Sequence, residues 1–320
     1  MRQNHRIKNP LSFLLLMAIL LLSFFNMCSH STEQAEQTGQ DQYQKQAFDF
    51  GGEIIFHSNF DGDNEIYKLS KAGIEKLTNN SWDDEYPAWA PDKSKIAFTA
   101  NPEGNYNIYT MTPQDTRITQ ITTAKTDDKD PAWFGDGRHI AYSQWKKRNV
   151  NKGLQLFKVN IESKKAERAL PDYDKIHALP HVSPTLQLIT FTGKRLMGWD
   201  VAMYDTQTKN VEFLVEGGNS CRARFSRDGK KLAYVSGSAD GKGDIWLMNP
   251  NGTDKIRLTN RDETYDYFPC WSPDGQYIAF NSSSQHDHNG DWQLYIIDIE
   301  TKETILVFDS PGNDVFPDWR

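Results

Sequence analysis

The chain has 320 residues, of which 38% are hydrophobic and 25% are charged, a balance typical of a folded protein and not of a disordered one. Its formal net charge is −7, so we expect no nucleic-acid partner. The aromatic share is 12%, with nine Trp and thirteen Tyr. The length is enough to bury one large core or several small ones.

Residues 1–28 differ from the rest of the chain. Three basic residues precede an uncharged run over 11–27, which is the pattern of a secretory signal or a membrane anchor. Cys28 stands where a bacterial lipoprotein carries its lipidated cysteine, but the residues before it are not the small ones expected there. Lipidation of Cys28, an uncleaved anchor and cleavage nearby therefore stay open. Residues 29–48 are polar and predict a flexible tether.

A short phrase recurs through the remainder of the chain. It reads Pro-Ala-Trp-Ala-Pro-Asp at 87–92, Pro-Ala-Trp-Phe-Gly-Asp-Gly at 131–137 and Pro-Cys-Trp-Ser-Pro-Asp-Gly at 269–275, with weaker copies elsewhere. The positions equivalent to the Trp are Trp89, Trp133, Val182, Phe225, Trp271 and Trp319, separated by 44, 49, 43, 46 and 48 residues. A period in the forties with four short strands per repeat predicts a β-propeller.

The number of blades follows from the two ends of the repeat region. Near residue 53 the chain begins with the second, third and fourth strands of a unit, and the segment 317–320 is a first strand with nothing after it. Together they complete one blade and close the ring, which removes its open edges. We therefore predict an all-β fold, a single six-bladed β-propeller over 49–320, closed by the C-terminal strand joining the first blade.

At these residues the sequence resembles the TolB-like propeller repeat, also called the WD40-like or PD40 repeat, over about residues 50–320. The resemblance implies a propeller and specifies function poorly, because this fold hosts binding proteins, lyases and peptidase gates. TolB proteins carry an α/β domain before the propeller. Only the tether stands in that place here, so the partner-docking role of that domain is not carried over.

One candidate ligand site lies at the mouth of the central channel. The residues five positions before each repeat anchor fall on loops that share one face, and they are Asp84, Asp128, His177, Ser220, Asp266 and Asp314. We predict that this ring attracts a cation, a basic peptide or a polyol. The alternative is that each Asp bonds to backbone N–H groups of its own turn. A histidine beside carboxylates would be favoured in its charged form unless burial or a metal opposes it.

Histidines supply a second hypothesis, that of an enzyme. His177 and His181 bracket an inner strand and are the candidate catalytic residues, while Gln285, His286 and His288 lie in a long loop on the same predicted face. Oligogalacturonate lyases share this repeat and hold a divalent metal with His and Gln. The resemblance thus implies an alternative function as a metal-dependent polysaccharide or oligosaccharide lyase, against solvated loop histidines.

Basic and aromatic residues mark the same face in two neighbouring repeats. They are Trp145 to Arg148 in one repeat, and Lys194, Arg195 and Trp199 in the next, and such residues suit sugar or peptide ligands. Cys221 and Cys270 occupy similar places in adjacent repeats, and we favour two unpaired thiols over a disulfide.

The sequence-based prediction is a non-catalytic binding scaffold of the cell envelope, exported by its N-terminal signal. We expect it in the periplasm or tethered to the outer membrane or cell surface, associated with membrane only through its N-terminus. We expect a monomer whose partner is an envelope protein or peptide, or else an oligosaccharide. The only cofactor that the sequence raises is a divalent cation.

Overall fold

The computed structural model describes residues 43, 49–147, 152–217, 219–286 and 291–320. The predicted signal, Cys28, nearly all of the predicted tether, Arg148 and His288 lie outside the described residues. Within the described part of the chain, no helix is long and apolar enough to cross a membrane.

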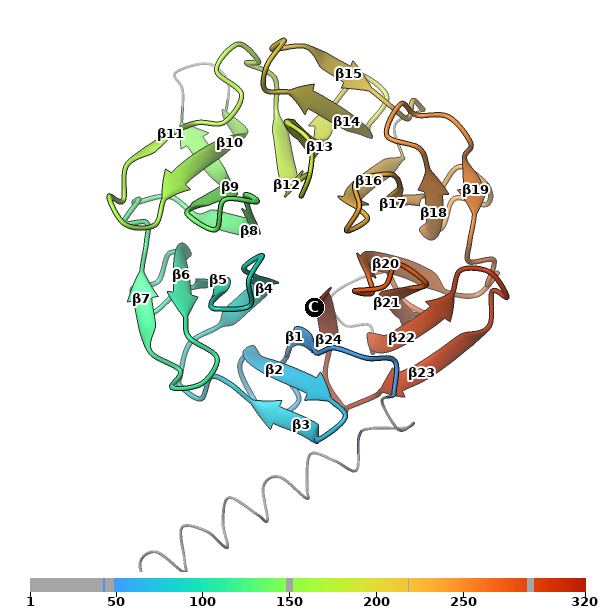
Figure 1. Cartoon of the computed structure of the whole chain (residues 1–320), viewed down its shortest axis with the longest axis horizontal. Coiled ribbons are helices and arrows are strands. Elements are labelled where there is room, and N and C mark those ends of the chain that lie inside the picture. Colours follow the sequence, from blue (N-terminus) through green and yellow to red (C-terminus); the bar gives the residue numbers. More distant parts are fainter. Residues whose placement is uncertain (1–42, 44–48, 148–151, 218, 287–290) are drawn as a thin grey trace, which may run out of the picture. The chain divides into compact units, whose positions relative to one another are not determined.

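The chain forms six four-stranded antiparallel sheets. Figure 1 shows them arranged as the blades of a closed ring. The inner strands are β4 (Asp84–Trp89), β8 (Asp128–Trp133), β12 (His177–Val182), β16 (Ser220–Phe225), β20 (Tyr265–Trp271) and β24 (Asp314–Trp319). The second strands are β5 (Ile96–Ala100), β9 (His139–Lys147), β13 (Leu188–Lys194), β17 (Leu232–Ser236), β21 (Tyr277–Ser283) and β1 (Ile54–Ser58).

The remaining strands lie farther from the channel. The third strands are β6 (Asn107–Met111), β10 (Lys152–Asn160), β14 (Trp199–Asp205), β18 (Asp244–Met248), β22 (Gln293–Asp298) and β2 (Glu65–Ser70). The outer strands are β7 (Ile118–Gln120), β11 (Ala166–Arg168), β15 (Val211–Phe213), β19 (Ile256–Arg257), β23 (Thr304–Phe308) and β3 (Gly73–Lys76). The predicted all-β, six-bladed fold is thus confirmed.

The second strands carry the core because they lie between neighbouring blades. All five residues of β1, β5 and β17 are buried, which is why their sequences are nearly continuous apolar runs and do not alternate with polar residues. The outer strands have solvent on one side, and β7 exposes both Ile118 and Thr119. The repeat period therefore sets six similar interfaces between blades, each with its own apolar cluster.

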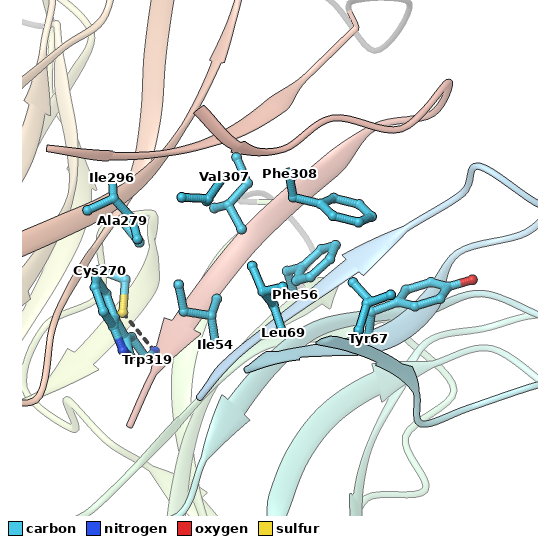
Figure 2. Packing of buried hydrophobic residues seen from close by; sticks show 12 residues of the cluster. Ile54, Phe56, Tyr67, Leu69, Cys270, Ala279, Ile296, Val307, Phe308 and Trp319 are labelled. Carbon is cyan, nitrogen blue, oxygen red and sulfur yellow. Dashed lines mark hydrogen bonds between the residues drawn. The ribbon is translucent and has the colours of Figure 1, made fainter. Parts of the chain in front are cut away.

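The ring closes where β24 pairs with β1, as the split first blade predicts. Ile54 lies opposite Trp319, and the Glu53 N–H donates to the Arg320 carbonyl at 2.7 Å. Trp319 is fully buried, and its backbone N–H donates to the Cys270 sulfur of the next blade at 3.1 Å (Figure 2). This one residue thus joins the first blade to the sixth.

Tyr43 belongs to the same compact unit as the propeller. Its ring lies 5.2 Å from that of Phe60, and its carbonyl accepts from the Asp309 N–H at 3.0 Å. One residue of the predicted tether thus contacts the cluster between the first and sixth blades.

Candidate functional site

A bulge in every inner strand builds the centre of the channel. The pairing of each inner strand with its neighbour shifts register after its first few residues. At each bulge one residue other than glycine has φ between 56° and 59°. These residues are Tyr86, Asp130, Leu179, Arg222, Phe268 and Phe316, and we call them the neck ring. For a residue other than glycine, this left-handed backbone conformation costs about 1–2 kcal/mol of conformational free energy. The fold sustains that cost at six equivalent positions.

The neck ring divides the channel into a wide part and a narrow part. All six members line a cavity of about 870 Å³ on the side where the inner strands begin, the mouth cavity. The same six line an inner cavity of about 50 Å³, the neck cavity. A third cavity of about 120 Å³ lies at the opposite end, beside the turns that follow the inner strands. The bulges therefore aim six different side chains at the boundary between mouth and neck.

One wall of the mouth cavity is charged. The Lys129 ammonium lies 3.1 Å from a Glu85 carboxylate oxygen and 3.4 Å from the centre of the Tyr106 ring. Asp127 and Asp130 line the same wall. Burial raises the pKa of Asp130 and of Glu85, which opposes their ionised forms.

The wall formed by the first and sixth blades is aromatic. The rings of Phe268 and Phe316 lie 3.8 Å apart, and His57 stacks on Phe316 at 5.3 Å. Burial lowers the pKa of His57 to about 3, with Lys129 a smaller cause, and its neutral ring accepts from the Tyr86 N–H at 3.2 Å. Such a wall offers apolar area and ring faces to a ligand.

The six residues predicted to bind at the mouth lie at or next to the start of each inner strand, and we call them the strand-start ring. They are Asp84, Asp128, His177, Ser220, Asp266 and Asp314. All are at most 4% exposed, and of the six only Ser220 contributes to the lining of the mouth cavity. The structure thus places them equivalently in the repeats, and all but Ser220 lie behind the surface of the channel.

Hydrogen bonds tie the strand-start carboxylates to neighbouring loops. Asp84 accepts from the Asn80 amide at 2.6 Å, and Asp128 accepts from the Gln144 amide at 2.7 Å. Asp266 pairs with Arg261 at 2.8 Å. The donors in these three bonds are side chains and not the backbone N–H groups that the alternative names. Both the ligand-binding role and the alternative therefore stay predictions.

Asp314 illustrates the same arrangement at the closing strand. Its carboxylate accepts from the Ser58 hydroxyl at 2.6 Å and from the hydroxyl and N–H of Ser310 at 2.7 and 2.9 Å. Burial raises its pKa to about 7 and those of Asp84 and Asp128 to about 7 and 6. The negative charge of this ring is therefore weaker at neutral pH than the residue types alone indicate.

The two candidate catalytic histidines, His177 and His181, lie in different surroundings. Burial lowers the pKa of His177 to about 4, and its Nδ1–H donates to the Lys175 carbonyl at 2.5 Å, so burial overrides the charged form expected beside carboxylates. His181 lines the neck cavity, where its Nδ1 accepts from the Phe225 N–H at 3.2 Å and burial lowers its pKa well below the ordinary value.

The loop predicted to hold a metal is only partly described. His286 lies at the mouth cavity, 3.1 Å from the Tyr267 hydroxyl, and Gln285 is exposed beside it. Among the described residues, no group of three or more His, Cys, Asp or Glu side chains is arranged to hold a metal ion. His288 is outside the described residues, so the metal hypothesis stays a prediction.

The aromatic residues predicted on this face lie at the mouth. Trp145 and Trp199 both line the mouth cavity, and Lys194 lies 5.2 Å from the Trp199 ring. Cys221 and Cys270 are unpaired thiols, the first half-buried at the mouth and the second buried between blades. The expectation of two unpaired thiols thus agrees with the structure.

The neck ring is not among the residues predicted from the sequence. Its members stand two residues after the strand-start positions, and five of the six precede a proline, as in Tyr86-Pro87 and Phe316-Pro317. They comprise five residue types at six positions, of which only two are charged, so a search for equivalent polar residues passes over them. The signal that identifies them is the fixed place before the repeated proline.

These features define the class of protein: it is a closed six-bladed propeller whose mouth cavity is large enough to admit a ligand. Residues 68–222 match the family described as TolB beta propeller domain. The chain therefore contains a TolB-like propeller.

Individual relatives agree with this family. The Tol-Pal system protein TolB of Nitratidesulfovibrio vulgaris is 35% identical over 57 residues, which span 18% of this chain and 13% of that protein. The structure of TolB from Acinetobacter baumannii has a TM-score of 0.70 at 21% identity, covering 85% of this chain and 67% of that one.

The lyases that share the repeat are more distant in structure. Oligogalacturonate lyase from Vibrio parahaemolyticus has a TM-score of 0.56 at 15% identity, covering 83% of this chain and 77% of that one. Similarity at this level shows a shared fold alone.

Proposed function

We propose that the protein is a non-catalytic binding scaffold of the cell envelope, whose mouth cavity receives a segment of a partner protein. The observation that carries this proposal is the cavity of about 870 Å³, which has a charged wall and an aromatic wall. Specific binding sites have volumes of a few hundred to about 1,000 Å³ and combine apolar area with a few placed polar groups. Aromatic residues and arginine are also the types enriched in protein interfaces.

The proposal includes the location and the domain organisation. We propose that residues 1–28 export the chain, that Cys28 or this segment holds it to a membrane, and that residues 29–48 tether the propeller. The similarity to a protein named for the Tol-Pal system supports an envelope protein as the partner class. The lyase alternative has no comparable observation in its favour within the described residues.

Site-directed photocross-linking in cells tests the proposal. A photoreactive phenylalanine replaces Trp145, which is 47% exposed at the mouth, or Leu186, which is 45% exposed on the opposite face between β12 and β13. The two positions are matched in exposed fraction, and the same photoreactive residue stands at both. We expect a discrete cross-linked envelope protein from position 145 and a yield at least tenfold lower from position 186. Equal yields from both positions would contradict binding at the mouth.

A further inference from the structure

Arg222 forms no ion pair in the described part of the chain, although the charges of Arg222 and Asp130 act on each other across the neck. Its guanidinium carries five N–H donors, and the one hydrogen bond recorded for it goes to the Cys221 sulfur at 3.2 Å, which is a weak acceptor. Its Nε–H is buried and has no partner. Buried cations are normally paired and hydrogen-bonded, because removal from water is costly. At least one buried N–H donor of Arg222 therefore lacks an acceptor among the described residues.

Three aromatic rings surround the guanidinium and fix its position. Its central carbon lies 4.5 Å from the ring centre of Phe268, 5.5 Å from that of Tyr267 and 6.0 Å from that of Phe316. Ring faces attract a cation but accept few hydrogen bonds, so they orient the guanidinium and leave its N–H edge available. Arg222 lines both the mouth cavity and the neck cavity, so a ligand can reach it from the mouth.

The charged groups that line the neck cavity determine the charge of a suitable ligand, and the volume of the cavity limits its size. Arg224 and Arg222 carry positive charge there, and Asp130 is the acidic residue in the lining. Arg224 donates to the Pro317 carbonyl at 3.2 Å and lies 3.7 Å from Asp318. The cavity measures about 50 Å³, enough for a few atoms, since about 10–15 Å³ of such space admits one water. A small planar anion such as a carboxylate fits this volume better than a bulkier tetrahedral anion, because the cavity admits only a few atoms.

We propose that the neck ring is a carboxylate-binding site, in which Arg222 holds the terminal or side-chain carboxylate of a segment that enters the mouth. This inference rests on the proposed function and adds the chemistry of the partner. The guanidinium fork matches a carboxylate with two parallel N–H···O bonds. The aromatic frame of Tyr267, Phe268 and Phe316 contacts the apolar part of the same segment.

Titration with sodium acetate at pH 7 tests the carboxylate site directly. Sodium chloride keeps the ionic strength constant, and the readouts are the ¹⁵N–¹H signal of the Arg222 Nε and the melting temperature. We expect a saturable shift of that signal and a rise in melting temperature that chloride does not reproduce. Inorganic phosphate is the second arm, and we expect weaker binding than for acetate. Phosphate that binds more tightly than acetate would overturn the assignment of a carboxylate.

Two substitutions at Arg222 and one matched control make the test specific. Arg222→Gln should weaken acetate at least about tenfold, because a charge-assisted hydrogen bond contributes about 1.5–3 kcal/mol. Arg222→Lys should weaken it less, since the charge stays and the fork is lost. Arg117→Gln, at an arginine 79% exposed and remote from the channel, should leave acetate binding unchanged. An Arg222→Gln protein that binds acetate like the parent overturns the site. If that variant does not fold, equal affinity in Arg222→Lys and the parent overturns it.

The acetate titration and the cross-linking experiment can give negative results independently of each other. Cross-linking from position 145 without saturable acetate binding would retain the scaffold and remove the carboxylate site. Saturable, Arg222-dependent acetate binding without cross-linking would retain an anion site and remove the proposed protein partner.

Discussion

The two rings of the inner strands are two residues apart in sequence and differ in almost every physical property. The strand-start ring is made mostly of one residue type, is at most 4% exposed and spends its hydrogen bonds within the propeller. The neck ring has residue types ranging from Arg222 to Leu179, adopts positive φ at every position and lines two cavities. The strand-start positions, which bond within the propeller, thus carry mostly one residue type. The neck-ring positions, which line the channel, carry several residue types.

The difference has a physical basis in how a repeat is built. A polar group buried at the same place in each blade needs a hydrogen-bond partner within the propeller, and Asp supplies two acceptor oxygens for the different donors that each blade offers. A side chain aimed into the channel meets five different neighbours and whatever ligand enters. We therefore expect substitutions in the first ring to act mainly on stability and those in the second mainly on binding.

Removal of residues 317–320 should have the largest effect, because both rings depend on closure by β24. The deletion leaves Asp314 and Phe316 in the chain but takes away buried Trp319 and its bonds to Gly51 and Cys270. Loss of a buried aromatic residue alone costs about 3–5 kcal/mol. We expect the melting temperature to fall by about 10 °C or more, or the protein to become insoluble. Arg320→Ala serves as the control, and a truncated protein that melts within two degrees of the parent would refute closure as the source of stability.

The two rings can be compared within a single strand. Asp314→Ala leaves the buried hydroxyls of Ser58 and Ser310 without their acceptor, and each such loss costs about 1–3 kcal/mol. Phe316→Ala removes a half-buried ring that faces the channel. We expect Asp314→Ala to lower the melting temperature by at least twice as much as Phe316→Ala, measured by differential scanning calorimetry. The reverse order would break the distinction between the rings.

The pH dependence of stability should identify the strand-start carboxyls. Burial raises the pKa of Asp84 from 3.8 to about 7, so the folded state binds more protons than the unfolded state between these values. Stability from this group is therefore present at low pH and is lost as pH rises from about 4 to 7. Asp84→Asn should gain stability relative to the parent between pH 5 and pH 8, on the order of 1–2 kcal/mol.

The buried histidines titrate in both proteins and do not disturb this difference. The pKa values of His57 and His177 are lowered by burial to about 3 and 4, so they remove stability as pH falls below about 6.5. Urea denaturation of the parent and the variant at each pH measures the difference directly. A difference that does not change from pH 5 to pH 8 would contradict a raised pKa for Asp84.

Trp145→Ala should have the smallest effect on stability. The side chain is 47% exposed at the rim of the mouth, so its removal should shift the melting temperature by no more than about two degrees. The same change should reduce capture of the envelope partner, because it removes aromatic area from the mouth. Lost stability with unchanged capture would place Trp145 with the structural residues.

The fold could be predicted from the sequence because the repeat itself indicates both the strands of a blade and the number of blades. The phrase around Trp89 recurs with a nearly constant period, and the split unit at the two ends requires closure, so the number of blades follows without any tertiary contact. The mouth face was also predictable, since Trp145, Trp199 and His286 do line the mouth cavity.

The individual site residues were harder to predict, for a local reason. A strand alternates its side chains, so counting from an anchor assigns each residue to a face. The bulge at Tyr86 and its equivalents interrupts this alternation, and the side chain of the bulge residue itself lines the channel. Burial then changes the chemistry of the residues behind it. Burial raises the pKa of Asp84 and lowers the pKa of His177, so both shifts favour the neutral form. The residue types alone do not indicate this.

The most direct test of the central claim is one cross-linking experiment on both rings at once. The photoreactive residue stays at position 145, and the background carries either Phe268→Ala from the neck ring or Asp314→Ala from the strand-start ring, a residue that does not line the mouth cavity. Melting temperatures are measured on the same proteins, and the cross-linked yield is normalised to the amount of folded protein. We predict that Phe268→Ala lowers the cross-linked yield at least fivefold with little loss of stability, and that Asp314→Ala lowers stability with the cross-linked yield per folded protein unchanged. A yield that falls with Asp314→Ala and not with Phe268→Ala would contradict the distinction between the two rings.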